Sequence, residues 1–354
     1  MSGVYLTDGA IGETRRVLFE NGRPVRIDIA RWSDEGRRAR WGDVYRARVR
    51  AIDAARGGAF LDLGLAQEQG FLPFDSHGHM RIAPNQHRPV TEGEMLIVRV
   101  AREGAREKNP VVAFVEGGPP GAPAGRIAKH ERDEDLHEAP PASPERREEI
   151  DAAIDEALAR TVPLRGGGRL TIERTAALTA IDVDSGARKG GGDLFARDLN
   201  MEAAREAMRQ LILRNQGGLA AIDFVSMRAG EHRKAVEAVL KEAAKQDHWN
   251  PIVAPMSRFG VVELSRAQLT RPIADILLDE EGAKSAETIA LETLRAIERE
   301  HASVRGRKIV ARAPQTAAGW LEREIIPWRA ALEARIGFLW EIEAGGTAID
   351  VRAV

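Results

Sequence analysis

Short runs of alternating apolar and polar residues dominate the first third of the chain and predict β-strands. Asn21-Gly22 lies between two of these runs, which is the signal of a hairpin turn. About five further runs within residues 36–115 predict a small closed β-barrel. In the clearest run, Tyr45, Ala47, Val49 and Ala51 share one face, and Arg46, Arg48 and Arg50 share the other.

Strands and helices alternate after residue 150, which predicts an α/β fold built from several modules. One helix is expected to start with Asn200 as its N-cap and to stop at Gly217-Gly218. A final module, residues 283–354, also mixes helices and strands, and Pro327 is expected to break its last long helix. The helix expected to start at Asn200 has an apolar face that contains Ala204, Met208, Leu211 and Ile212.

Composition narrows the class of protein. The chain has 354 residues, enough for roughly two to four modules, and it has no cysteine. The lack of cysteine excludes a disulfide scaffold, an iron–sulfur cluster, a Cys-ligated zinc site and a Cys nucleophile. No apolar run approaches the roughly 20 residues that span a bilayer, and residues 1–10 carry no targeting signal. We therefore expect a soluble, cytoplasmic protein with no membrane span.

The net charge of −2 conceals an uneven distribution of charge. Residues 36–115 carry 13 Lys and Arg against 9 Asp and Glu. Residues 116–150 carry 9 acidic and 5 basic residues together with six prolines. The barrel segment therefore has the local positive charge that a polyanionic partner requires, and the proline-rich acidic stretch is expected to be a linker.

Two apolar segments, Ala180-Ile181-Asp182 and Ala221-Ile222-Asp223, both end in an aspartate. Ligands bind at the carboxyl ends of strands in open α/β sheets, so neighbouring strands would bring the two carboxylates together. Such a pair favours a cation, and oxygen ligands suit Mg²⁺, with Mn²⁺ as an alternative. The competing interpretation, that both aspartates only cap helices or end strands, is equally compatible with the pattern.

Other candidate side chains lie near these segments or in the barrel. Asp184 is a third candidate carboxylate, and Arg188 and Lys189 in the glycine-rich loop after it are candidate phosphate contacts. Aromatic residues beside arginines suit single-stranded nucleic acid, because bases stack on the rings and phosphates pair with the cations. From the pattern alone, however, an aromatic residue in a strand is more often part of the core. The barrel candidates are Phe60, Phe71, Lys108, Arg46 and Arg48.

Several segments together resemble the ribonuclease E/G family, and they occur in the order of that family. In the barrel segment they run from Gly42 to Tyr45, from Gly58 to Gly64 and from Gly70 to Pro73. In the α/β segment they are Thr171-Ile172-Glu173-Arg174-Thr175, Ile181-Asp182-Val183-Asp184-Ser185-Gly186, Asn200-Met201-Glu202-Ala203-Ala204, Gly217-Gly218-Leu219, Ile222-Asp223-Phe224 and Ser257-Arg258-Phe259-Gly260.

The resemblance implies an arrangement of modules. A ribonuclease H-like region, residues 1–35 and 150–175, is split by an RNA-binding barrel of the OB type at residues 36–115. The linker covers residues 116–149. A deoxyribonuclease I-like catalytic subdomain is implied at 176–282, and a small α/β domain at 283–354.

The resemblance also implies an activity, the Mg²⁺-dependent hydrolysis of single-stranded RNA that leaves 5′-phosphate products, in RNA processing or decay. The acids matching Asp182 and Asp223 hold the metal ion in that family. The aromatic residues matching Phe60 and Phe71, with a lysine matching Lys108, hold the RNA.

Three departures from the family pattern bear on this expectation. Asp184 stands where the family has asparagine, no 5′-sensor signature occurs in residues 116–150, and the cysteines of the family's zinc link are missing from residues 271–283. No zinc is therefore expected, and a homodimer would have to form without that link. The alternative function is a catalytically degenerate RNA-binding protein of the same family.

Overall fold

The computed structural model describes residues 3–105, 108–130, 139–186, 190–304 and 306–354. Its contacts divide the chain into two compact units. The first unit contains residues 1–5, 17–27 and 151–273, and the second contains residues 6–16, 28–150 and 274–354. The three-stranded sheet of β1 (Val4–Ala10), β2 (Glu13–Glu20) and β3 (Arg23–Arg31), hydrogen-bonded in that order, contributes residues to both units.

A six-stranded sheet is the centre of the first unit. Only one neighbouring pair, β14 with β15, is parallel, and the other four pairs are antiparallel. The order across the sheet is β12 (Thr161–Pro163), β13 (Arg169–Arg174), β14 (Thr179–Asp184), β15 (Gly218–Asp223), β17 (Val261–Arg266) and β16 (Ile252–Val253).

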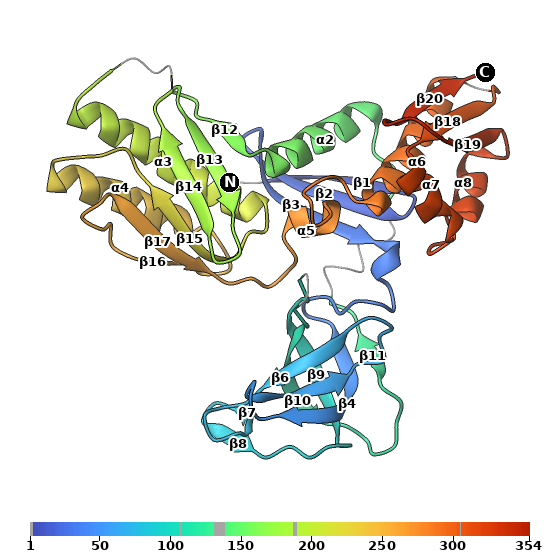
Figure 1. Ribbon diagram of the computed structural model, residues 1–354, viewed down its shortest axis with the longest axis horizontal. Helices are drawn as coiled ribbons and strands as arrows, with labels where there is room; N and C mark the ends of the chain where they lie inside the picture. Colours follow the sequence, from blue (N-terminus) through green and yellow to red (C-terminus); the bar gives the residue numbers. More distant parts are fainter. Residues whose placement is uncertain (1–2, 106–107, 131–138, 187–189, 305) are drawn as a thin grey trace. The chain divides into compact units, whose positions relative to one another are not determined.

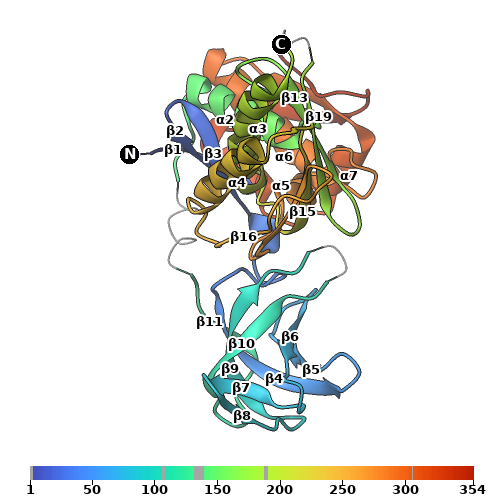
Figure 2. The same cartoon turned by 90° about the vertical axis from the view of Figure 1, so that its left-hand side faces the viewer.

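Two helices, α3 (Asp193–Leu213) and α4 (Gly230–Ala244), cover one face of this sheet (Figures 1 and 2). Alternate strand residues point into the apolar core that the helices close, among them Ile181 and Ile222, both almost fully buried. Because side chains alternate along a strand, the aspartate after each of these isoleucines lies on the opposite face of the sheet.

The expected limits of α3 are wrong at both ends. The helix begins at Asp193 rather than near Asn200, so Asn200 lies within it. It ends before Asn215, whose φ of 51° is left-handed, rather than at Gly217-Gly218. Asparagine tolerates this conformation better than most residues, so it ends the helix two residues earlier than the glycine pair would.

A closed five-stranded barrel forms part of the second unit and confirms the fold expected for residues 36–115 (Figure 2). Its strands close in a ring, because β4 pairs with both β5 and β9. The connectivity, with β6 and β10 parallel and the other pairs antiparallel, is compatible with an OB-type barrel. The strands are β4 (Val44–Asp53), β5 (Gly58–Asp62), β6 (Gln69–Pro73), β9 (Met95–Arg102) and β10 (Val111–Gly117).

The alternation expected along β4 holds only as far as Val49. Tyr45, Ala47 and Val49 are buried, but Ala51 is exposed. A register shift between Val49 and Ala51 in the pairing with β5 explains the difference, because an extra residue in one strand moves the following side chains to the other face.

Elements beyond the expected strands also belong to the barrel region. A hairpin of β7 (Met80–Ala83) and β8 (Gln86–Arg88) follows β6. Within the stretch expected to be a linker, β11 (Gly125–Ala128) pairs with β4, and α2 (Pro144–Leu158) begins. That stretch therefore contains regular structure at both of its described ends.

The C-terminal part of the second unit packs helices on a small sheet of order β19-β18-β20. Pro327 breaks the expected last helix into two, as predicted, and precedes the second of them. No helix in the described ranges is both long and apolar enough to cross a membrane. The remaining elements are α5 (Ile273–Leu277), α6 (Ala286–Ser303), β18 (Ile309–Ala313), α7 (Gln315–Glu322), α8 (Trp328–Ile336), β19 (Trp340–Ala344), β20 (Asp350–Ala353) and the short 3-10 helix Trp32–Asp34.

Candidate active site

Asp182 and Asp223 stand directly opposite each other, as the last pair in the parallel register of β14 and β15. Neighbouring strands lie roughly 5 Å apart, so the two side chains are within reach of one ion. Both lie on the sheet face opposite the helices, and both are exposed. The adjacency on which the sequence-based hypothesis depended is therefore present.

The charges at this sheet edge affect the ionisation of Asp182. Partial burial, and then the negative charges of Asp223 and Asp184, raises the pKa of Asp182 above its usual value. A raised carboxyl pKa means that its ionised form is held at a cost in free energy. A bound cation would remove that cost, because it would neutralise the charges that repel each other.

Asp184 lies on the same sheet face but already has two partners. One of its carboxylate oxygens accepts a hydrogen bond from the Gly186 N–H at 2.8 Å, and the other pairs with the Arg169 guanidinium at 2.5 Å. These contacts, the Gly186 N–H first, hold the pKa of Asp184 below its usual value. The structure thus gives Asp184 a role in shaping the turn after β14 and in binding Arg169.

Among the residues that the structure describes, no group of three or more His, Cys, Asp or Glu side chains is arranged to hold a metal ion. The carboxylates that the strand register brings together are the pair Asp182 and Asp223. Arg188 and Lys189, the candidate phosphate contacts, lie outside the described residues.

Asn200 is a feature that the sequence pattern misassigned. It is fully buried within α3, its amide nitrogen donates to the Val225 carbonyl at 2.7 Å, and its amide oxygen accepts from the Val225 N–H at 3.1 Å. Val225 follows Asp223 by two residues, so Asn200 holds the chain where it leaves β15. A signal for this role was present, because Asn200 lies four residues from both Ala196 and Ala204 and so shares their core-facing stripe.

Removing this clamp is expected to destabilise the first unit. Asn200→Ala leaves the half-buried N–H and carbonyl of Val225 without these partners, which costs about 1–3 kcal/mol of the free energy of unfolding. Urea denaturation followed by circular dichroism measures the loss. The control is Asp198→Ala, at an exposed position on the same helix. Equal unfolding midpoints for the two variants would contradict the clamp.

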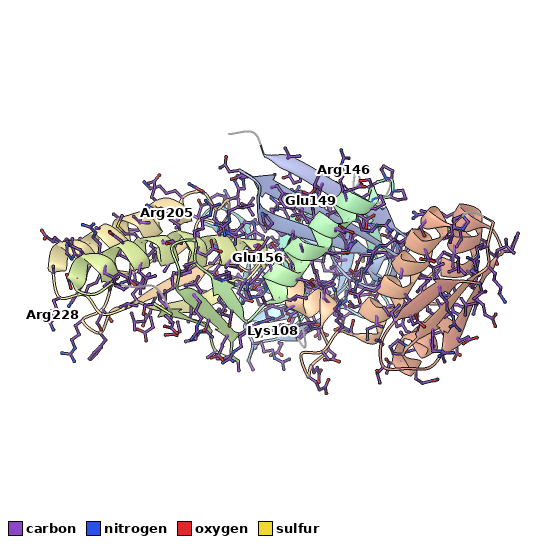
Figure 3. All side chains as sticks on the ribbon, turned by 90° about the horizontal axis from the view of Figure 1, so that it is seen from above. Lys108, Arg146, Glu149, Glu156, Arg205 and Arg228 are labelled. Carbon is purple, nitrogen blue, oxygen red and sulfur yellow. The ribbon has the colours of Figure 1, made fainter. Side chains whose placement is uncertain are left out.

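A second contact, between the starts of α3 and α4, holds the rest of the loop that follows Asp223. Asp193 accepts hydrogen bonds from the N–H groups of Arg228 at 2.5 Å and Ala229 at 3.0 Å, and it pairs with His232 at 2.5 Å. The Arg228 and Ala229 N–H groups, together with His232, lower the pKa of Asp193 to about 2. The side chain of Arg228 is exposed at this end of the unit (Figure 3).

Polar side chains also fix α3 against α2 on the far side of the same unit. Gln210 donates to Glu156 at 2.8 Å, and the Arg209 guanidinium contacts both Glu156 and Glu206. Figure 3 shows Glu156 on α2 and the exposed Arg205 on α3. The helix that carries Asn200 and Asp193 is therefore held along its length by polar contacts.

Phe60 and Phe71 lie on the outer surface of the barrel rather than in its core. They are register partners on β5 and β6, their ring centroids are 5.4 Å apart, and both are half-buried. The core positions beside them belong to Ala59, Leu61 and Leu72. The core interpretation of the two aromatic residues is thus wrong, and they form one paired aromatic surface.

Three cationic residues lie near this aromatic pair in the barrel. The Arg56 guanidinium lies 5.7 Å from the centre of the Phe60 ring. On the other side, the Phe71 N–H donates to the carbonyl of Pro110, two residues after the exposed Lys108 (Figure 3). Arg48 lies next to the pair on β4, opposite Asp62, whereas Arg46 donates to the Pro123 carbonyl at 2.6 Å.

Comparisons with known proteins find ribonucleases among the proteins that part of this chain is similar to. Ribonuclease E of Escherichia coli (strain K12) is 36% identical over 196 residues, which are 53% of this chain and 18% of that protein. Ribonuclease E of Buchnera aphidicola subsp. Acyrthosiphon pisum (strain APS) is 34% identical over 212 residues, 57% of this chain and 23% of that protein. Ribonuclease G of Escherichia coli (strain K12) is 32% identical over 198 residues, 53% of this chain and 40% of that protein.

The chain thus spans less than half the length of each of these relatives. The model of the ribonuclease E/G family matches residues 127–269, a range that includes both Asp182 and Asp223. Over residues 127–269, the chain is therefore similar to the ribonuclease E/G family.

Proposed function

We propose that this protein is a metal-dependent endoribonuclease that hydrolyses phosphodiester bonds of single-stranded RNA, in RNA processing or decay. The observation that carries the proposal is the pair Asp182 and Asp223, the last pair in the register of two parallel strands, within a region similar to the ribonuclease E/G family. The names of the relatives support an RNA substrate.

The donor set of the acid pair fits a hard divalent cation. Mg²⁺ commonly takes one or two protein carboxylates and fills its other positions with water and substrate phosphate oxygens. Asp182 and Asp223 would hold the ion. Burial, and then the neighbouring carboxylate charges that a cation would balance, raises the pKa of Asp182. When bound, Mg²⁺ would supply a water of lowered pKa and charge stabilisation at the scissile phosphate. The proposed hydrolysis breaks the P–O3′ bond, so that one product carries a 5′-phosphate and the other a 3′-hydroxyl.

The chain's own residues position the reacting groups. Asn200 and Asp193 hold the two ends of the loop after Asp223, which keeps the strand end in place. Asp184 binds Arg169, and this leaves Asp182 and Asp223 as the carboxylate pair for the cation. The finer classification, a ribonuclease H-like region beside a deoxyribonuclease I-like catalytic subdomain, is part of the proposal.

The barrel surface is proposed to hold the single strand. Bases stack on aromatic rings whatever their sequence, while arginine and lysine side chains pair with phosphates. Phe60 and Phe71 provide the rings, and Arg48, Arg56 and Lys108 provide positive charge around them.

The direct test is a cleavage assay with end-labelled single-stranded RNA, run with Mg²⁺, with Mn²⁺ and with EDTA. Cleavage that requires the divalent ion and leaves 5′-phosphate ends supports the proposal. RNA binding without cleavage under any of these conditions would instead establish the alternative, a catalytically degenerate RNA-binding protein. Absence of both binding and cleavage would exclude the two functions together.

The aromatic pair makes a separate prediction about binding. Phe60→Ala combined with Phe71→Ala is expected to weaken RNA binding by about 1–3 kcal/mol for each base that loses its stacking partner. Fluorescence anisotropy with a labelled single-stranded RNA measures the change. The control is Phe338→Ala, because Phe338 is a strongly exposed phenylalanine in the C-terminal part of the chain. Equal affinities for the two proteins would show that RNA does not use this surface.

A further inference from the structure

An exposed aromatic residue, Phe259, lies near the sheet edge that carries the acid pair. The side chain is 74% exposed, in the turn that leads into β17. The Arg258 guanidinium lies 4.8 Å from the centre of its ring, and Arg258 is exposed as well. The turn therefore presents a stacked arginine and phenylalanine to solvent.

The backbone of this turn is closely hydrogen-bonded. Ser257 N–H donates to the Val261 carbonyl at 2.8 Å, and Gly260 N–H donates to the Ser257 carbonyl at 3.1 Å. The Ser257 hydroxyl oxygen accepts from the N–H groups of Phe259 and Val261, both at 3.3 Å. Gly260 has a φ of 92°, a conformation that L side chains rarely adopt. These contacts place Phe259 at a defined position.

The same turn is joined to the strand end that carries Asp223. Val261 is the register partner of Asp223, and the Phe224 N–H donates to the Gly260 carbonyl at 3.4 Å. Phe259 thus lies two residues from the position opposite Asp223. An RNA strand whose scissile phosphate approaches Asp182 and Asp223 has its neighbouring nucleotides within reach of this turn.

Single exposed apolar residues are common on protein surfaces and often have no function. Phe259 differs from such a residue in three respects, namely its hydrogen-bonded turn, its arginine partner and its position beside the acid pair. A ring next to a guanidinium offers a face on which a nucleobase stacks and a cation for the adjoining phosphate.

From these observations we infer that Arg258 and Phe259 position the RNA, with Phe259 stacking on a base beside the scissile phosphodiester and Arg258 contacting a neighbouring phosphate. The inference rests on the proposed function and adds a contact within the unit that carries the acids. It makes Phe259 a positioning residue whose loss acts on substrate binding rather than on the chemical step.

The test compares Phe259→Ala, Phe259→Trp and the matched control Phe338→Ala, since Phe338 is 80% exposed. In steady-state cleavage of a short single-stranded RNA, Phe259→Ala is expected to raise KM by roughly 5- to 150-fold, with kcat changed little. Phe259→Trp retains a stacking surface and is expected to keep KM within about threefold of the original. A KM for Phe259→Ala equal to that of Phe338→Ala would overturn the inference.

Substrates with one abasic nucleotide identify the stacked base. At the stacked position, removing the base is expected to raise the KM of the parent protein. The same removal is expected to leave the KM of Phe259→Ala unchanged, because the stacking contact is already lost. If every abasic position affects the two proteins equally, Phe259 contacts no base.

Failure of the proposed function remains separate from failure of this inference. Should the parent protein bind RNA without cleaving it, Kd takes the place of KM in this test. A higher Kd for Phe259→Ala than for Phe338→Ala supports the inference, and equal values overturn it. Should the parent protein cleave RNA while Phe259→Ala matches the control in KM and Kd, the proposed function stands and only the inference fails. Should the parent protein neither bind nor cleave RNA, both are overturned.

Discussion

Asp182→Asn and Asp223→Asn are each expected to reduce cleavage of single-stranded RNA by about 10³-fold or more while RNA affinity changes little. Charge stabilisation by a bound metal ion is worth several kcal/mol of activation free energy, and every 1.36 kcal/mol is a factor of ten in rate. Each substitution removes one of the two carboxylates that the strand register brings together. Affinity is expected to persist because the barrel surface remains unchanged.

A matched control and a stability measurement make this result specific. Glu173→Gln alters an exposed carboxylate on β13, on the same sheet face, which pairs with Arg160. It is expected to cleave RNA at the parent rate. Asp182→Asn is expected to leave the fold intact, and even to raise the free energy of unfolding, because burial and two like charges raise the pKa of Asp182. Cleavage by both Asn variants at the parent rate would remove these aspartates from the active site.

Glu13→Gln is expected to lower the free energy of unfolding of the second unit by about 3–5 kcal/mol. The Glu13 carboxylate is 1% exposed, and it accepts from Arg31 at 2.8 Å and from Arg295 at 2.9 Å. Glutamine keeps the shape but removes the charge, so two buried guanidinium groups lose the partner that offsets their desolvation. Urea denaturation at pH 7 measures the loss, with the exposed Glu322→Gln on α7 as the control.

The pH dependence of the free energy of unfolding is a second measurement that tests the stabilisation by Glu13. Burial by itself would raise the pKa of Glu13, but the charges of Arg31 and Arg295 outweigh it and lower the pKa to about 2. A lowered folded-state pKa contributes stability above the unfolded-state pKa near 4.5, and this stability is lost as pH falls toward 2. The contribution is about 3 kcal/mol, so the parent protein should lose that much more than Glu13→Gln between pH 5 and pH 2 (roughly the interval between the two pKa values). Parallel pH profiles for the two proteins would contradict the ion-pair assignment.

Much of the candidate site could be predicted from local patterns. The runs that end at Asp182 and Asp223 are apolar over a few residues and then carry an acid, which is sufficient to predict two buried strands with polar ends. The alternation in β4 and the Asn21-Gly22 turn predict barrel strands and a hairpin in the same way. These features depend on side-chain size, polarity and backbone preference within a few residues, and all of that information is local.

Contacts between distant residues were not accessible to such patterns. Asn200 has the chemistry of an N-cap, yet its partner is Val225, 25 residues away. Asp184 is a third candidate ligand in the sequence, and its partner Arg169 is known only from the pairing of β13 with β14. Phe60 and Phe71 are large apolar residues, but the barrel interior beside them is filled by Ala59, Leu61 and Leu72.

The chain's periodicity and motifs were therefore sufficient to predict the barrel and the two strands that carry an aspartate, and to reveal the resemblance to a ribonuclease family. The zero cysteine count excluded a Cys-ligated zinc link in the same way. Packing decided which strands are neighbours, the register that sets Asp182 opposite Asp223, and which face of the barrel carries its aromatic residues. The physical reason is that burial preferences are properties of each residue, whereas register and partner depend on which distant segments pack together to close the core.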